Sequence, residues 1–263
     1  LPPEVADSAI IDMKAHTDDF FLLTNAGTMW IAGQDVERVS GNNSDGSNTW
    51  HQVKQGSQST NLTNVVEFSG NREAAYALKA DGTIWTWGRS IARGNGQGET
   101  DVNHAVQVNR SGLPGGVTLS QLGVYSYDSS GDASNTTGVL ALGSDGRVYG
   151  IGWSGDEGEI ITNNGDFISR WTAVNGTNGT TPLTNVVFLA TSESSEEYPT
   201  AGVIINGFGG NNQLLTWGDN DDNNIGHGDS GRTNNPSVPA GFTSSDNPVY
   251  LSLGGHAASY LNI

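Results

Sequence analysis

The stretch that decides the fold is Ala75-Tyr-Ala-Leu-Lys-Ala-Asp-Gly-Thr-Ile-Trp-Thr-Trp-Gly88. Apolar residues alternate on both sides of an Asp-Gly pair, which is the pattern of two short β-strands joined by a tight turn. The pattern recurs three times in altered form, at Phe21–Gly33, Val139–Gly152 and Val203–Gly218. The closing glycines of the four copies are 55, 64 and 66 residues apart. The chain is therefore built from an internal repeat of about sixty residues.

Each copy is preceded by a short apolar run and followed by a segment that ends in Val. A unit is thus predicted to contain four short strands, and the last of the four is expected to lie outermost in the sheet. The predicted repeats span 11–53, 65–108, 119–174 and 186–238, with a partial repeat at 249–263 and the outer strand of a preceding unit at 1–5. Sustained 3.6-residue periodicity is absent from the sequence, so we expect helices to be minor.

Four-stranded units at this spacing favour propeller blades over the rungs of a solenoid. We therefore predict an all-β protein, a β-propeller of four-stranded blades with four full repeats plus partial blades at both ends. Asp81-Gly82 and Asp145-Gly146 are expected to form two-residue hairpin turns with both φ angles positive, and Asn25-Ala26-Gly27 a weaker version. The whole chain, 1–263, is read as one propeller domain or part of one.

Composition excludes several classes of function. The chain has 11 Lys and Arg against 28 Asp and Glu, a formal net charge of −17, so we expect no nucleic-acid partner. No apolar run is long enough for a membrane-spanning helix, and we expect no membrane insertion. Cysteine is absent, which removes disulfides, thiolate metal sites and Cys nucleophiles. Because Leu1 is not an initiator Met, we expect the chain to be processed or to be an excerpt.

The repeat resembles the regulator of chromosome condensation repeat family. The resemblance rests on the pattern Ala-Leu-x-x-Asp-Gly-x-Ile-Trp-x-Trp-Gly, on Gly94-Asn-Gly-Gln-Gly98 after it, and on the closing Val108. It implies a seven-bladed β-propeller. The family's namesake activates a small GTPase by nucleotide exchange, while relatives are inhibitors, adhesins and domains of larger proteins. Four full units fall short of seven, so either the ring closes with fewer blades or more chain lies outside this sequence, and we expect the second.

Long loops are expected to gather on one face of the propeller. If the strands run up and down in turn, the third-to-fourth connections share a face with the first-to-second connections, and both kinds carry insertions and many acidic residues. The alternative is that the loop insertions accumulated by neutral drift and that the acidic residues only keep the protein soluble. The candidate partner-binding residues on this face are the aromatic Tyr125, Tyr127 and Tyr198 and the acidic Asp156, Glu157, Asp219, Asp221 and Asp222.

No stretch carries a convincing catalytic or metal signature. Asp219–Gly226 resembles the start of a calcium loop, but Asn224 and Ser230 stand where a helix-loop-helix site needs Gly and Glu. The five His are far apart, and no Gly-x-Ser-x-Gly elbow exposes a serine. We therefore predict no catalytic residue, no metal and no cofactor, and leave open whether the acidic loops bind calcium.

The leading hypothesis is a non-enzymatic interaction or structural module that binds a protein or glycan through its acidic loop face. Low Lys, high Asn, Ser, Thr and Gly, and partial units at both ends suggest an extracellular or virion-surface protein, such as an attachment fibre, decoration protein or adhesin. Its partners would include other domains or subunits of a larger assembly. The alternative is a guanine-nucleotide exchange factor for a small GTPase, and a glycoside hydrolase is a more distant one.

Overall fold

The chain forms antiparallel β-sheets in succession along the sequence. The computed structural model describes residues 1–16, 19–33, 47–57, 59–71, 74–88, 101–126, 137–154, 160–161, 167–192, 199–207, 210–220, 223–229, 231–243, 245–254 and 258–262. Within them lie four four-stranded sheets and one two-stranded sheet, and the only helical segment is the 3₁₀ turn η1 (Asp7–Ala9). The predicted all-β class is confirmed. In the described part of the chain no helix has the length and apolar character to cross a membrane.

Each sheet is one blade, numbered in chain order. Blade 1 contains β1 (Ile10–His16), β2 (Asp19–Thr24), β3 (Met29–Gly33) and β4 (Ser47–Gln52). Blade 2 contains β5 (Val65–Gly70), β6 (Ala74–Lys79), β7 (Ile84–Gly88) and β8 (Val102–Gln107). Blade 3 contains β9 (Leu119–Ser126), β10 (Thr137–Gly143), β11 (Val148–Trp153) and β12 (Phe167–Ala173). Blade 4 contains β13 (Val186–Thr191), β14 (Thr200–Asn206), β15 (Asn212–Gly218) and β16 (Thr233–Ser237), and partial blade 5 contains β17 (Pro248–Leu253) and β18 (Ala258–Asn262).

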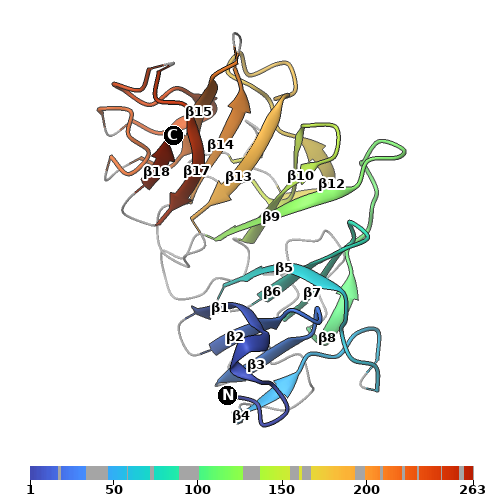
Figure 1. Cartoon of the computed structure of the whole chain (residues 1–263). Coiled ribbons are helices and arrows are strands. Elements are labelled where there is room, and N and C mark those ends of the chain that lie inside the picture. Colours follow the sequence, from blue (N-terminus) through green and yellow to red (C-terminus); the bar gives the residue numbers. More distant parts are fainter. Residues whose placement is uncertain are drawn as a thin grey trace.

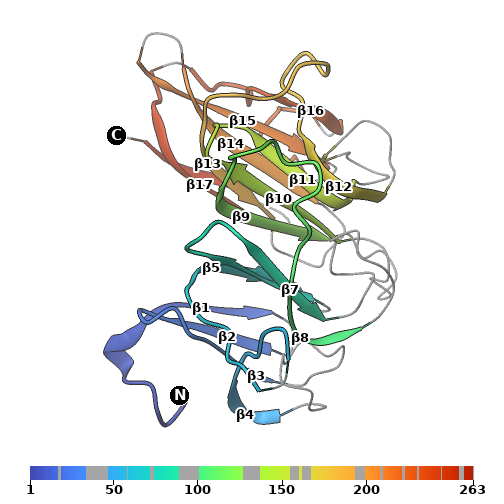
Figure 2. The same ribbon diagram turned by 90° about the vertical axis from the view of Figure 1, so that its right-hand side faces the viewer.

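The blades are arranged in succession about a common centre, as propeller blades are, and together they form an open arc. Their first strands β1, β5, β9, β13 and β17 lie on the inner side of the arc, and blade 1 and partial blade 5 stand at its two ends (Figure 1). The view from the side shows the same succession of blades (Figure 2). Residues 1–5, expected as an outer strand, contain a turn instead, in which Val5 N donates to Pro2 O over 3.0 Å.

The hairpin turns differ from the expected two-residue form. Gly82 N donates to Lys79 O and Lys79 N to Thr83 O, both at 2.9 Å, so the loop has three residues. Only Gly82 in this loop has a positive φ, of 77°, and Asp81 does not. Asp81 Oδ1 instead accepts the Thr83 N–H and hydroxyl, at 3.0 and 2.6 Å, and these bonds lower the pKa of its carboxyl. The turns that end in Gly27 and Gly146 have the same hydrogen bonds, so the two-residue prediction is wrong for Asp81-Gly82 and Asp145-Gly146.

A glycine at or next to the end of the third strand of each complete blade marks a bulge. Gly33, Gly88, Gly152 and Gly218 all have positive φ, and the register with the fourth strand shifts at each of them. A Cβ at Gly218 would lie 2.5 Å from Pro199 O, too close for any side chain. The most regular feature of the sequence repeat is therefore a backbone requirement of the blade.

The hydrophobic core lies between the blades and not within one. Each cluster takes one face of a blade and the opposite face of the next: Phe21 and Met29 of blade 1 meet Phe68 and Trp87 of blade 2, and the later interfaces repeat this arrangement. The hairpin turns support the same contact, since Gly27 O accepts from Val65 N over 3.1 Å and Gly146 O from Val186 N over 3.0 Å. These bonds place the hairpin turns and the inter-blade connections on the same face of the arc.

Candidate functional site

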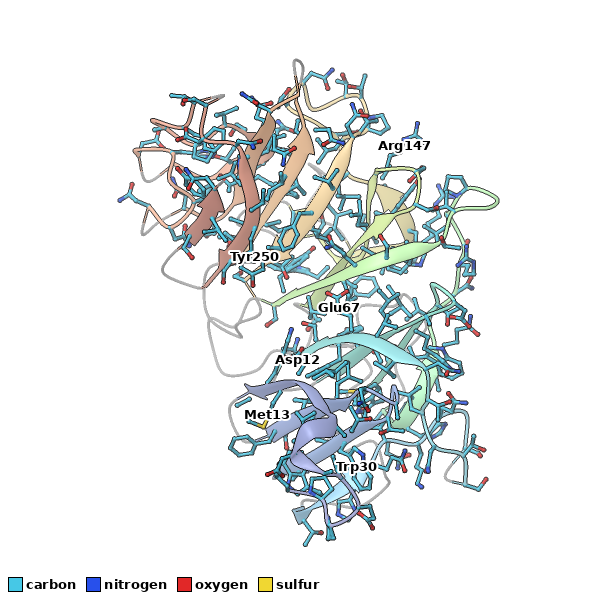
Figure 3. All side chains as sticks on the ribbon, viewed as in Figure 1. Asp12, Met13, Trp30, Glu67, Arg147 and Tyr250 are labelled. Atoms are coloured by element: carbon cyan, nitrogen blue, oxygen red, sulfur yellow. The ribbon has the colours of Figure 1, made fainter. Side chains whose placement is uncertain are left out.

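The inner strands meet around a central groove. The third residue of each inner strand is Asp12, Glu67, Gln121, Phe188 or Tyr250. Figure 3 shows Asp12, Glu67 and Tyr250 on the inner side of the arc, on strands β1, β5 and β17. Far-apart parts of the sequence are thus brought to one axis, and no sequence motif marked these residues because each is a single position in a separate repeat.

These inner positions link one blade to the next. Glu67 Oε2 accepts the Leu122 N–H at 3.1 Å, and Gln121 Oε1 accepts the Leu189 N–H at 2.9 Å. In both bonds the third residue of one inner strand reaches the fourth residue of the following one. Phe188 has no acceptor, and its ring packs on that of Tyr250 with centroids 5.2 Å apart. The polar link is therefore replaced by an aromatic contact at partial blade 5.

The groove has a volume of about 400 Å³ and a mixed lining. Lys14, Glu67 and Gln121 supply polar groups, while Phe188 and Tyr250 form an apolar wall. The Lys14 ammonium lies 5.4 Å from the centroid of the Phe68 ring. Such a lining can bind one inserted side chain or a small polar ligand. Among the described residues no three His, Asp or Glu gather as metal ligands.

Tyr125 is not a surface contact residue. Its side chain is 0% exposed, and its hydroxyl donates to Trp153 O over 2.5 Å. Gly138 lies opposite it on β10, and a Cβ there would sit 2.2 Å from the Tyr125 ring, so the glycine makes room for the ring. Burial raises the pKa of this hydroxyl well above its usual value of 10. The expectation that Tyr125 meets a partner is therefore wrong, because the ring fills the core.

Asp219 is also a buried structural residue. Its side chain is 1% exposed, and Arg232 Nε lies 3.4 Å from its Oδ2. The same connection is organised by Asn220, whose amide donates to the carbonyls of Asp229 and Gly231 and whose Oδ1 accepts from Ile225 N. Because its carboxylate is buried and paired with Arg232, Asp219 is no longer a candidate for binding a partner.

The other six candidates lie outside the described residues. They are Tyr127, Tyr198, Asp156, Glu157, Asp221 and Asp222. Their roles on the loop face, and any calcium binding there, stay predictions.

His227 lies between the third and fourth strands of blade 4, and no pattern in the sequence predicted its contacts. The Thr216 hydroxyl donates to Ile225 O at 2.9 Å, so its oxygen accepts from His227 Nε2, also at 2.9 Å. His227 Nδ1 lies 3.1 Å from Thr233 Oγ1. Burial is the largest influence on its pKa and lowers it below the usual 6.5, although Asp229 opposes this. The imidazole thus links β15 to β16 through Thr216 and Thr233, and burial favours its neutral form.

Comparisons with known proteins identify the fold. No family model and no curated protein matches the sequence. Human WBSCR16 has a similar structure, with a TM-score of 0.71 at 17% identity over 97% of this chain. Yeast RCC1 (Prp20), solved bound to Kap60, gives 0.68 at 16% identity over 100% of this chain, and Prp20p from Saccharomyces cerevisiae solved separately gives 0.66 at 16% over 100%. This chain spans 56–58% of the length of those three chains. The chain has the fold of the RCC1-type β-propellers, as its repeat pattern indicates.

Proposed function

We propose that the chain is a non-catalytic propeller module that binds a basic protein partner. The observation that carries the proposal is the RCC1-type fold, matched over the whole chain at TM-scores of 0.66–0.71. Yeast Prp20 has been solved bound to Kap60, and the work on Prp20p concerns its binding to Gsp1p and histones. All of these partners are proteins, which supports a protein partner for this chain.

Charge favours a basic partner. With 28 acidic and 11 basic side chains, the field of the molecule is strongly negative at neutral pH. Such a field attracts basic surfaces, speeds their association and repels nucleic acid. A histone or a basic protein of similar charge density fits this surface better than an acidic protein does.

Nucleotide exchange on a small GTPase is the second candidate. It is favoured by the likeness to Prp20p, whose binding to Gsp1p is described, and by the activity of the family's namesake. The comparisons support it better than a role as virion-surface fibre or adhesin. Placement outside the cell or on a virion, and glycan binding, remain predictions from composition alone.

Two measurements on the full chain separate these candidates. We expect the chain to bind core histones and to lose at least about tenfold in affinity when salt rises from about 0.05 to 0.5 M, because screening weakens charge attraction. Serum albumin, an acidic protein, serves as the negative control. Failure to bind any basic protein at low salt contradicts the proposal.

Release of labelled GDP from a panel of small GTPases tests the second candidate. Acceleration that is absent with heat-unfolded chain would establish exchange. If no basic protein binds at low salt and no GTPase responds, while a glycan array gives saturable binding, the surface-protein hypothesis replaces both.

A further inference from the structure

We propose that the central groove holds a lysine or arginine side chain of a basic protein at its turn-side end, which is the end at which the inner strands begin. The proposal rests on the proposed function and names the place at which such a partner is held. Two features of the inner strands carry it: exposed apolar residues at their second position and carboxylates at their third.

The second residue of the inner strands is mostly apolar and exposed. Ile11, Val66 and Val187 have exposed fractions of 58%, 51% and 42%. Each lies where the register with the second strand shifts, so it is an extra residue with no partner across the sheet. Val66 and Val187 belong to blades 2 and 4, which pack against a blade on either side, so this exposure is a property of the repeat. The corresponding residues are Ser120 in blade 3 and Val249 in partial blade 5.

The third residue, one position further along each strand, is a carboxylate in blades 1 and 2. Asp12 and Glu67 both lie on the inner side of the arc (Figure 3). Glu67 reaches the Leu122 N–H of the following blade, as described above. Asp12 also has a following blade beside it, but its side chain is shorter by one methylene. Within the described part of the chain the half-buried Asp12 carboxylate has no hydrogen-bond or ion-pair partner, so it is open to a cation from outside.

The charge changes along the groove. Asp12, Glu67 and Lys14 are the charged residues of the inner strands as the structure describes them. Lys14 lies two residues further along β1 than Asp12, and its ammonium is held 5.4 Å from the centroid of the Phe68 ring. A group that enters from the turn side therefore meets the two carboxylates before it meets the ammonium.

A lysine or arginine side chain matches this order of groups. Its stem is apolar and its end is charged, so the stem can contact Ile11 and Val66 while the charged end reaches Asp12. An anion would meet the carboxylates first and be repelled. An apolar side chain would take water away from the Asp12 carboxylate without pairing it, which is unfavourable. The negative field of the whole chain also attracts a cationic partner.

The test measures the affinity of the full chain for core histones at low salt. Asp12→Asn removes the charge and keeps the shape of the side chain, and it should weaken binding at least about tenfold. The control is Asp101→Asn, which makes the same charge change at an exposed position just before β8, an outer strand. It should weaken binding less than about twofold, because it changes only the long-range field.

A second pair of variants tests the apolar contact. Val66→Ser leaves the charge unchanged and removes apolar surface at the turn-side end of the groove, so it should weaken binding at least about threefold. Val238→Ser is the control, because Val238 is 39% exposed and lies directly after the outer strand β16. It should leave the affinity unchanged.

The outcomes separate this site from the proposed function. Salt-sensitive binding of histones that is equally strong in Asp12→Asn and Asp101→Asn overturns the site and leaves the basic partner in place. Equal affinities of Val66→Ser and Val238→Ser overturn the contact with the apolar stem. If no histone binds the unchanged chain, both the site and the proposed function are overturned. Urea denaturation of each variant shows whether a loss of binding comes from a loss of folding.

Discussion

The interface of blades 3 and 4 and that of blade 4 with partial blade 5 follow one plan, yet only the first is sealed. Inner-strand leucines fill both, Leu189 in the first and Leu251 in the second, and both are buried. The first also contains Trp217, which is 0% exposed, whereas the second keeps a groove of about 460 Å³. The comparison shows that inner strands position the blades and that third-strand side chains close the space between them.

The largest effect is expected for Trp217→Ala. Removing this buried ring leaves a cavity and an unpaired Ile160 carbonyl, so unfolding should cost about 3–5 kcal/mol less. Urea denaturation followed by circular dichroism measures the difference. The matched change at the open interface, Tyr260→Ala, should cost about 1 kcal/mol or less, because the ring is 44% exposed. Equal losses would show that the two interfaces do not differ as described.

The next largest effect is expected for Gly82→Val, which acts on the contact between a turn and the following blade. Gly82 has a φ of 77°, and a Cβ there would lie 2.9 Å from Thr118 Cβ. Backbone strain and overpacking together should destabilise the protein by about 2–4 kcal/mol. Gly116→Val is the control, since Gly116 has a φ of 83° but nothing within 4 Å of its Cβ position. A thermal-melting midpoint as high for Gly82→Val as for Gly116→Val would contradict the close contact.

A smaller effect is expected at the inner strands. Gln121→Ala removes the acceptor for the Leu189 N–H and should reduce the free energy of unfolding by about 1 kcal/mol. Gln121→Glu keeps an acceptor, as Glu67 does one blade earlier, and should recover most of the loss. If both variants unfold at the same urea concentration as the unchanged chain, the polar link does not hold the blades together.

The smallest effect is a pH dependence at His227. Burial lowers the pKa of His227 in the folded protein below 6.5, so the unfolded chain takes up the proton first as pH falls. The stability that the neutral imidazole contributes is present above about pH 6.5 and is lost as pH falls through the lowered pKa. His227→Gln should therefore lose less stability than the unchanged chain between pH 7.5 and 5.5, measured by urea midpoints. An identical loss would rule out His227 as the titrating group.

Particular residues show how far the sequence could predict this structure. The Asp-Gly pairs placed the hairpins correctly, but Gly82 N bonding to Lys79 O makes the loops three residues long, a choice that only the backbone geometry reveals. The fourth strand of blade 2 begins at Val102 and includes the polar Asn103 and His104, because polar residues pair as well as apolar ones in an outer strand. Tyr125 looked like an insertion residue, and its burial depends on Gly138 of the neighbouring strand.

The sequence by itself determined the blades: alternation, turn glycines and the glycine at each closing bulge are local signals that recur at every copy. Tertiary structure alone decided what lies between the blades. The link from Glu67 to Leu122, the aromatic contact of Phe188 with Tyr250 and the groove beside β18 each join residues from different repeats. Such contacts arise when rigid sheets pack face to face, and which side chains meet there depends on shape, so the repeat pattern alone does not identify the partners.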